Sequence, residues 1–199
     1  SIYTDIEIDG INIVKPQIEK ANHLVKNNKV NDRVTFHYGD AQNIPFSDNS
    51  FDNIYAIESA FHFEDKAKFI NESKRVLKGN GEISIADIVI RPEHLKISDW
   101  YKVSIAKHGL ATKEFYYKDK WMNLLKSIGY VKINIEDITV NVSNVLPHWI
   151  KLIKTSEDRL LNLYPKIFLR MLCNCLEYAY KMGDKCPFGY ILITAKKLK

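Results

Sequence analysis

Apolar runs alternate with stretches of helical spacing along the first part of this chain. A β-rich run over residues 5–13 leads to Pro16, a residue that the first turn of a helix tolerates. Apolar residues then recur three or four positions apart until the next apolar run at residues 34–38. A strand, a helix and a strand in this order predict a parallel sheet in an α/β fold. The expected buried stripe of the helix consists of Ile18, Ala21, Leu24 and Val25.

The next segment repeats the same alternation. We expect a strand at residues 50–58 and an amphipathic helix at residues 65–77, ended by two nearby glycines. Residues 83–90 are almost continuously apolar except for Asp87, which is typical of a strand buried on both faces. The glycines are Gly79 and Gly81, and the inward residues of the helix are Ala67, Ile70 and Leu77.

The second half of the chain changes character. Residues 93–117 mix aromatic and polar residues without a strand period, which indicates a helical cap. A helix over residues 121–128 ends at a glycine and leads to a strand at residues 130–140. Helical spacing resumes over residues 145–183, a second cap, and a last strand is expected at residues 188–195.

Composition limits the class of protein. With 199 residues and 46% hydrophobic content, we expect a single domain over residues 1–199, with no membrane span and no secretion signal. An odd number of cysteines without CxxC spacing favours reduced thiols in the cytoplasm and no metal site. The net charge of +5 comes from lysines mixed with acids, so we expect no nucleic-acid partner and leave a homodimer open. The cysteines are Cys173, Cys175 and Cys186.

Several short motifs occur along the predicted order of strand, acidic loop, strand, helix and glycine turn. They are Gly39-Asp40-Ala41, Ile44-Pro45-Phe46, Ser50-Phe51-Asp52 and Arg75-Val76-Leu77-Lys78-Gly79. This segment resembles the class I S-adenosylmethionine (SAM) dependent methyltransferases. The resemblance implies a Rossmann-like sheet, mostly parallel with an antiparallel last strand, and SAM as the cofactor.

The resemblance places cofactor-binding residues after the first two predicted strands. Asn12, Ile13 and Gln17 match the family's ribose-binding position, although the family normally has a carboxylate where this chain has Asn12. Asp40 and Ala41 match the residues that bind adenine. The alternative for both Asn12 and Asp40 is a side chain that only forms a turn.

The run from Glu58 to Phe63 follows the strand at residues 50–58, where this fold places ligand-contacting loops. It resembles the same loop of tocopherol methyltransferases and, more closely, of bacterial rebeccamycin-type sugar O-methyltransferases. This implies that Glu58 and Ser59 bind the cofactor. Relatives often have paired histidines in this loop, whereas here Phe61 precedes His62.

His62 and Asp87 are the candidate catalytic residues. A neutral imidazole accepts a proton near neutral pH, so His62 is suited to activate an alcohol. Asp87 interrupts an apolar strand, and a carboxylate there needs polar partners. We expect both side chains to reach one rim, where Asp87 orients the imidazole or holds a substrate hydroxyl. The alternative for His62 is a histidine packed in an aromatic cluster.

One expected part of the fold does not occur in the sequence. The glycine-rich turn that cradles the cofactor follows the family's first strand, about 20 residues before the ribose-binding position. Asn12 lies too close to residue 1 for that arrangement. The hypothesis is therefore that the chain starts at the family's second strand and lacks the central first strand.

These observations favour SAM-dependent methyl transfer to a small molecule. The acceptor group is expected to be the hydroxyl of a natural product or of a sugar-like compound. An N- or C-methyltransferase is the alternative within the same class, because only the caps would differ. A non-catalytic SAM-fold binding protein is the alternative from another class.

Overall fold

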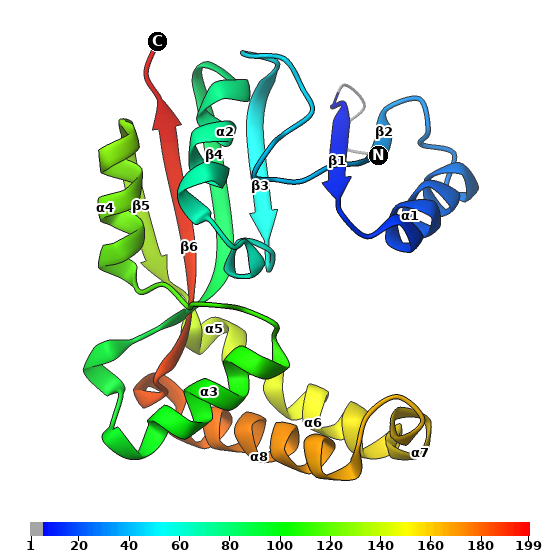
Figure 1. Ribbon diagram of the computed structural model, residues 1–199, viewed down its shortest axis with the longest axis vertical. Helices are drawn as coiled ribbons and strands as arrows, with labels where there is room; N and C mark the ends of the chain where they lie inside the picture. Colours follow the sequence, from blue (N-terminus) through cyan, green and yellow to red (C-terminus); the bar gives the residue numbers. More distant parts are fainter. Residues whose placement is uncertain (1–5) are drawn as a thin grey trace.

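The computed structural model describes residues 6–199, and its strands form two sheets (Figure 1). Strands β1 and β2 pair in parallel as a two-stranded sheet. The second sheet has the order β3-β4-β6-β5, with β3 parallel to β4 and β6 antiparallel to both of its neighbours. An α/β fold with an antiparallel last strand is therefore confirmed. The strands are β1 (Ile8–Asn12), β2 (Val34–Tyr38), β3 (Phe51–Ile57), β4 (Leu77–Ile90), β5 (Tyr130–Asp137) and β6 (Phe188–Lys197).

Helix α1 (Lys15–Asn27) connects the two strands of the small sheet and has its proline in the first turn, as expected. The Asn22 amide fastens it to β2, since it donates to the Phe36 carbonyl (3.0 Å) and accepts from the Phe36 N–H (3.1 Å). The expected apolar stripe is only partly right, because Val25 is buried while Leu24 is 50% exposed. A two-stranded sheet is too narrow to cover the full stripe.

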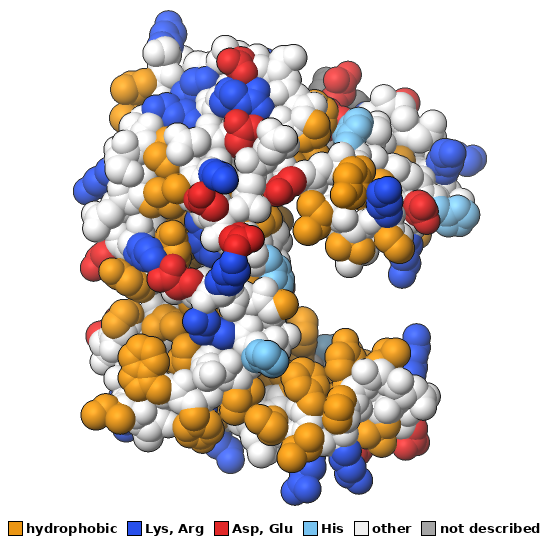
Figure 2. Space-filling model, in the orientation of Figure 1, with side chains coloured by type: hydrophobic (Ala, Val, Ile, Leu, Met, Phe, Trp, Pro, Cys, Tyr) orange, Lys and Arg blue, Asp and Glu red, His pale blue; other side chains and the backbone are white. Residues whose placement is uncertain are grey.

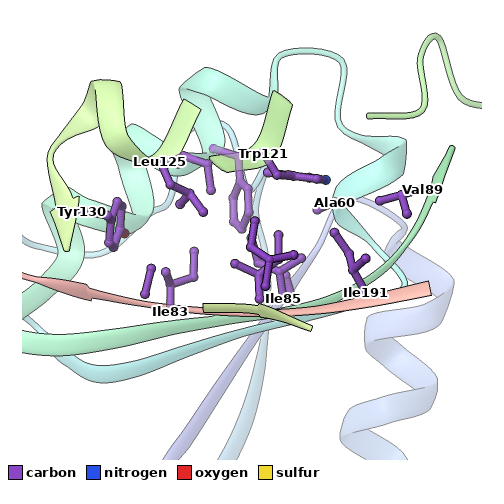
Figure 3. Close-up of a cluster of buried hydrophobic side chains, with 14 of the residues drawn as sticks. Ala60, Ile83, Ile85, Val89, Trp121, Leu125, Tyr130 and Ile191 are labelled. Carbon is purple, nitrogen blue, oxygen red and sulfur yellow. The ribbon is translucent and has the colours of Figure 1, made fainter. Parts of the chain in front are cut away.

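The main core lies between the four-stranded sheet and helices α2 (Lys66–Val76) and α4 (Lys118–Ile128) (Figure 3). Helix α4 ends at Gly129, whose φ of 86° is the left-handed conformation that glycine adopts readily. Helix α2 begins after Asp65, whose carboxylate accepts from the Lys68 N–H. The core side chains labelled in Figure 3 are Ala60, Ile83, Ile85, Val89, Trp121, Leu125, Tyr130 and Ile191.

Strand β4 differs from the prediction in two ways. It starts at Leu77, directly after α2, and Gly79 and Gly81 lie within it rather than at the end of a helix. The pairing of β3 with β4 shifts by several residues there, and this irregularity accommodates the glycines. Burial on both faces is wrong: Ile83, Ile85, Asp87 and Val89 are buried under the helices, while the alternate residues are half-buried.

A helical lobe forms the lower part of Figure 1. It contains α3 (Trp100–Gly109), α5 (Thr139–Ser143), α6 (Leu146–Thr155), α7 (Glu157–Leu161) and α8 (Lys166–Met182). One-turn 3-10 helices lie at Ala60–His62, Pro92–His94, Ile97–Asp99 and Gly183–Lys185. Within the described residues, no helix is long and apolar enough to cross a membrane.

The lobe is fastened to the sheet at buried Arg91, just after β4. Its guanidinium donates to the carbonyl of Cys186 (2.7 Å) and to the carbonyl of Asp184, and it pairs with Asp137 (3.3 Å). The Arg91 side chain thus binds both the segment before β6 and the end of β5. This fixes where the polypeptide leaves the sheet and where it returns.

Candidate functional site

The candidate site lies along the carboxyl ends of the parallel strands. Strands β1 and β3 run in the same direction in Figure 1, so their carboxyl ends face the helical lobe. The molecule is visibly hollowed between the β1–α1–β2 unit and the lobe (Figure 2). Open α/β sheets bind ligands beyond the carboxyl ends of their strands.

Asn12 and Asp40 each form a turn at the end of a strand. Asn12 Oδ1 accepts from the Val14 N–H (2.9 Å), and its amide donates to Gln17 Oε1 (2.8 Å). Asp40 Oδ1 accepts from the Gln42 N–H (2.8 Å). The structure thus has the turns considered as an alternative, and it brings Asn12 and Gln17 into contact. Because the Gly39 N–H donates to the Asn12 carbonyl (3.1 Å), the two turns lie side by side at the carboxyl ends of β1 and β2.

A polar cavity of about 480 Å³ opens beside Asp40. It lies between the loop after β2 and the start of α2, which are joined by the Asp65 N–H donating to Gln42 Oε1 (2.7 Å). Its acidic lining suits ligand amino and hydroxyl groups, which donate hydrogen bonds. Of the other residues assigned to the cofactor, Ile13 is exposed and Ala41 packs against the main core. The cavity is lined by Asp40, Gln42, Asn43, Glu64, Asp65 and Lys68.

Arg75 holds the loop that carries Asp40, a role that the sequence analysis missed. Its guanidinium donates to the carbonyls of Ile44 (2.9 Å) and Phe46 (2.8 Å), and it pairs with Glu72 (2.7 Å) and Asp48 (2.8 Å). The hydrogen bond from Arg75 lowers the pKa of Glu72. In the sequence, this contact is indicated by the spacing of Glu72 and Arg75, because residues at positions i and i+3 of a helix are neighbours on its surface.

Glu58 directly follows β3 and has an unusual backbone conformation. Its φ is 47°, in the left-handed region that costs free energy for a residue other than glycine. Its carboxylate accepts from the Tyr190 hydroxyl (3.2 Å), and burial together with this carboxylate raises the pKa of Tyr190. The neighbouring Ser59 is half-buried. Such local strain is typical of functional loops, and here it turns the chain towards residues 60–63.

His62 is exposed on the 3-10 turn that follows, with its ring centroid 3.9 Å from that of Phe61. Asp87 is not on the accessible rim, so that expectation is wrong. It is 1% exposed, because it lies on the helix-covered face of β4 and the strand continues to Ile90. Its carboxylate accepts from the N–H groups of Phe61 (2.7 Å) and Ile88 (2.9 Å). Burial raises the pKa of Asp87 to about 7.

Two further buried side chains bind the same turn, and neither was predicted to have a role. Lys66 Nζ donates to the carbonyls of Phe61 (3.2 Å) and Phe63 (3.0 Å), and Thr112 Oγ1 donates to the Phe61 carbonyl (2.5 Å). Burial lowers the pKa of Lys66, while Asp87 opposes this shift. A lysine in the first turn of a predicted amphipathic helix gave no signal of burial.

A second cavity, of about 420 Å³, runs along α3 on the lobe side. Among the aromatic residues of the lobe, Trp149 and Tyr101 are exposed, whereas the Tyr178 hydroxyl donates to the buried Asp99 carboxylate (3.0 Å). Within residues 6–199, no cluster of three or more His, Cys, Asp or Glu residues could hold a metal ion. The second cavity is lined by Trp100, Val103, Ser104, Lys107, His108, Thr112 and Lys113.

Residues 3–85 match the family described as "Methyltransferase domain". Over this segment the chain is similar to methyltransferases. It is 27% identical over 194 residues to the 27-O-demethylrifamycin SV methyltransferase of Amycolatopsis mediterranei, covering 97% of this chain and 70% of that protein. It is 29% identical to the O-methyltransferase resE of Aspergillus sclerotiorum, covering 97% of this chain and 68% of resE.

Solved structures of other proteins share the fold of this chain. Phosphoethanolamine N-methyltransferase 2 of Haemonchus contortus, in complex with SAM, has a TM-score of 0.76 at 19% identity, covering 97% of this chain and 44% of that one. The [4+2]-cyclase SpnF has a TM-score of 0.78 at 23% identity, covering 97% of this chain and 67% of SpnF. The second match shows that the fold alone does not determine the reaction.

The chain spans only part of the length of these proteins. The covered share is 70% for the rifamycin enzyme, and it is 32% for methyltransferase GfsG of Streptomyces halstedii, which is 41% identical over 88 residues. The activity and the acceptor of the whole protein are therefore matters for a proposal.

Proposed function

We propose that this chain transfers a methyl group from SAM to the hydroxyl of a natural product or sugar-like acceptor. The observation that carries the proposal is the exposed His62, next to the strand ends that carry the polar candidate cofactor residues. Relatives named as O-methyltransferases, including an erythromycin 3''-O-methyltransferase, support a hydroxyl acceptor.

The residues at the strand ends fit the chemistry of the cofactor. Asn12 and Gln17 offer amide groups to ribose hydroxyls, and Asp40 offers a carboxylate to the adenine amino group. The backbone N–H of Ala41 would donate to a ring nitrogen of adenine, and Ile13 would contact the nucleoside. Glu58 and Ser59 would bind the cofactor from the end of β3. The acidic cavity beside Asp40 supports this assignment.

When bound, the cofactor would supply a methyl group that its sulfonium charge makes electrophilic, and the carbon–sulfur bond that breaks would release S-adenosylhomocysteine. The chain's contribution is to bind the acceptor and to take its proton. In this proposal, His62 Nε2 or Nδ1 accepts the hydroxyl proton as the new oxygen–carbon bond forms, an effect on the order of 10²–10⁴-fold. We propose that α3 and α6–α8 form the acceptor side as caps of one domain.

The substitution His62→Ala tests the base. In the full chain it is expected to lower kcat by about 10²-fold or more and to leave the dissociation constant of SAM nearly unchanged. Transfer of labelled methyl from SAM to 27-O-demethylrifamycin SV and to glycosylated macrolides provides the assay. His23→Ala, an exposed histidine of α1, is the matched control. Turnover of His62→Ala within a few-fold of wild type would reject the role.

Asp40→Ala tests the adenine site. Loss of the acceptor is expected to weaken SAM binding by roughly 1–3 kcal/mol, measured by titration calorimetry. Asp52→Ala is a matched control, because that exposed carboxylate pairs with Lys78 and does not line the cavity. An unchanged dissociation constant for Asp40→Ala would remove Asp40 from the site.

We also propose that a strand from polypeptide outside the described residues fills the space between β1 and β3. Each of these strands pairs on only one side within residues 6–199, and Tyr55 and Ile57 on β3 are about 70% exposed. A protein consisting of residues 1–199 alone should melt without cooperativity and bind SAM weakly. A cooperative melt with micromolar SAM binding by such a monomer would contradict this proposal.

A further inference from the structure

Buried side chains bind the backbone on both sides of Phe61. Its N–H donates to Asp87 Oδ2 (2.7 Å), and its carbonyl accepts from Thr112 Oγ1 (2.5 Å) and Lys66 Nζ (3.2 Å). The three side chains are 1%, 7% and 3% exposed, respectively. The Phe61 carbonyl belongs to the peptide bond that leads into His62.

The 3-10 turn itself is short. It consists of Ala60–His62, and its internal hydrogen bonds are His62 N–H to the Ser59 carbonyl (3.0 Å) and Phe63 N–H to the Ala60 carbonyl (3.2 Å). Such a short turn has poorer hydrogen-bond geometry than an α-helix and little stability of its own. Lys66 also binds the Phe63 carbonyl, so it holds the backbone on both sides of His62.

We infer that Lys66, Asp87 and Thr112 are positioning residues that fix the backbone of the 60–63 turn and thereby aim the His62 side chain. The inference rests on the proposed role of His62. The three residues come from α2, from β4 and from the segment before α4, so the turn is fixed relative to three separate parts of the fold.

The chemistry of these residues supports positioning over simple packing. A buried ammonium and a buried carboxyl group each cost free energy, and apolar residues would fill the same volume at lower cost. Here the Lys66 ammonium donates to the carbonyls of Phe61 and Phe63, and the Asp87 carboxylate accepts from the Phe61 N–H. Thr112 also lines the cavity along α3, which places the turn against the acceptor side of the lobe.

Thr112→Val tests the inference, because it removes the hydroxyl and nearly keeps the shape. In the full chain we expect kcat to fall about 10-fold, with the dissociation constant of SAM unchanged, and Thr112→Ser to restore kcat to within about twofold of wild type. Thr139→Val is the matched control, since Thr139 is also buried and hydrogen-bonded but lies at the start of α5.

Two further measurements separate this inference from the proposed base. In the His62→Ala background, Thr112→Val should cause no additional loss of kcat, because Thr112 acts through His62. Hydrogen exchange should show faster exchange of the amides of residues 60–63 in Thr112→Val, whatever the activity is.

The outcomes then differ for the two ideas. Normal turnover of His62→Ala rejects the base, and the exchange experiment still decides whether Thr112 holds the turn. Equal losses of kcat from Thr112→Val in both backgrounds, or unchanged exchange of residues 60–63, would overturn the positioning role. A loss of kcat in Thr139→Val as large as in Thr112→Val would also overturn it.

Discussion

The two sheets of this protein are built in different ways. The four-stranded sheet has a core in which Ile70, Ile83, Ile85 and Leu125 are fully buried. The β1–α1–β2 unit has a single buried residue within its elements, Val25. The candidate nucleoside site thus starts on a unit with little core of its own, whereas the His62 turn is attached directly to the main core. Stability and cofactor binding are therefore expected to respond to different substitutions.

A small number of contacts connect the two units. The Phe46 ring packs edge-on against His37 of β2 (5.3 Å between centroids) and against Phe51 of β3 (5.0 Å). Arg75 binds the backbone of the same loop. Within the described chain, substitutions in this loop are therefore expected to affect the stability of both sheets.

The largest difference is expected between two leucines. Leu125→Ala should lower the free energy of unfolding by roughly 3–5 kcal/mol, because it leaves a cavity in the main core. Leu24→Ala, at an exposed position of α1, should cost less than about 1 kcal/mol. Urea unfolding measures both. Similar losses for the two variants would show that the units share one core.

The buried carboxyl group of Asp87 should make stability depend on pH. Its pKa is about 7 in the folded state against 3.8 for an ordinary Asp, so the folded state binds more protons between these values. The free energy of unfolding should therefore fall as pH rises from 4 to 7.5, by about 2–4 kcal/mol. The groups that act on it are Lys66, Glu58 and the N–H groups of Phe61 and Ile88.

Asp87→Asn removes this titration and is the comparison for urea unfolding at several pH values. Lys66 titrates with the opposite slope, because burial lowers its pKa and its contribution grows as pH rises. The difference between wild type and Asp87→Asn isolates the carboxyl group. Parallel pH profiles of the two proteins would show that Asp87 is ionised throughout.

Arg75→Lys should act mainly on the β1–α1–β2 unit and its cofactor site. Lysine keeps the charge but cannot bind two carbonyls and a carboxylate as the planar guanidinium does. We expect SAM binding to weaken by about 1–2 kcal/mol, measured by calorimetry, with a smaller change in the urea midpoint. Arg159→Lys, on an exposed position of α7, controls for the exchange of residue type. An unchanged affinity would show that the Asp40 loop holds its shape without Arg75.

The smallest effect is expected in the main core itself. The Tyr130 hydroxyl is buried without a hydrogen-bond partner among the described residues, and burial raises the pKa of Tyr130. Tyr130→Phe should therefore raise the free energy of unfolding by up to about 1 kcal/mol. Tyr55→Phe, on the exposed side of β3, should have no such effect. A destabilised Tyr130→Phe would indicate a partner for the hydroxyl.

Local patterns in the sequence were enough to predict most elements. Pro16 at the start of α1, Gly129 at the end of α4 and the apolar faces of the helices depend on neighbouring residues, so they can be read directly. The face of β4 that carries Asp87 could not be predicted in this way. It depends on which side of the sheet the helices cover, and a nearly continuous apolar run hides the alternation.

The contacts around His62 could not be predicted from local sequence patterns either. The sequence singled out His62 and Asp87 and predicted that both side chains reach one rim, whereas Asp87 is buried and binds the Phe61 backbone. Thr112 lies 51 positions from Phe61, and only the folded chain brings the two together. The assigned cofactor roles of Asn12, Ile13, Gln17, Asp40, Ala41, Glu58 and Ser59 stay predictions.

The pairing of β5 with β6 has a consequence for how this protein can evolve. Asp137 near the end of β5 lies opposite Ile191 of β6, and the Ile138 N–H donates to the Tyr190 carbonyl (2.9 Å). The two strands thus form a hairpin in which α5–α8 take the place of the turn. Because closing a longer loop costs only slightly more entropy, helices can be lengthened, shortened or exchanged here while the sheet keeps its register. Mutation can remodel the proposed acceptor side in this segment without rebuilding the core beneath it.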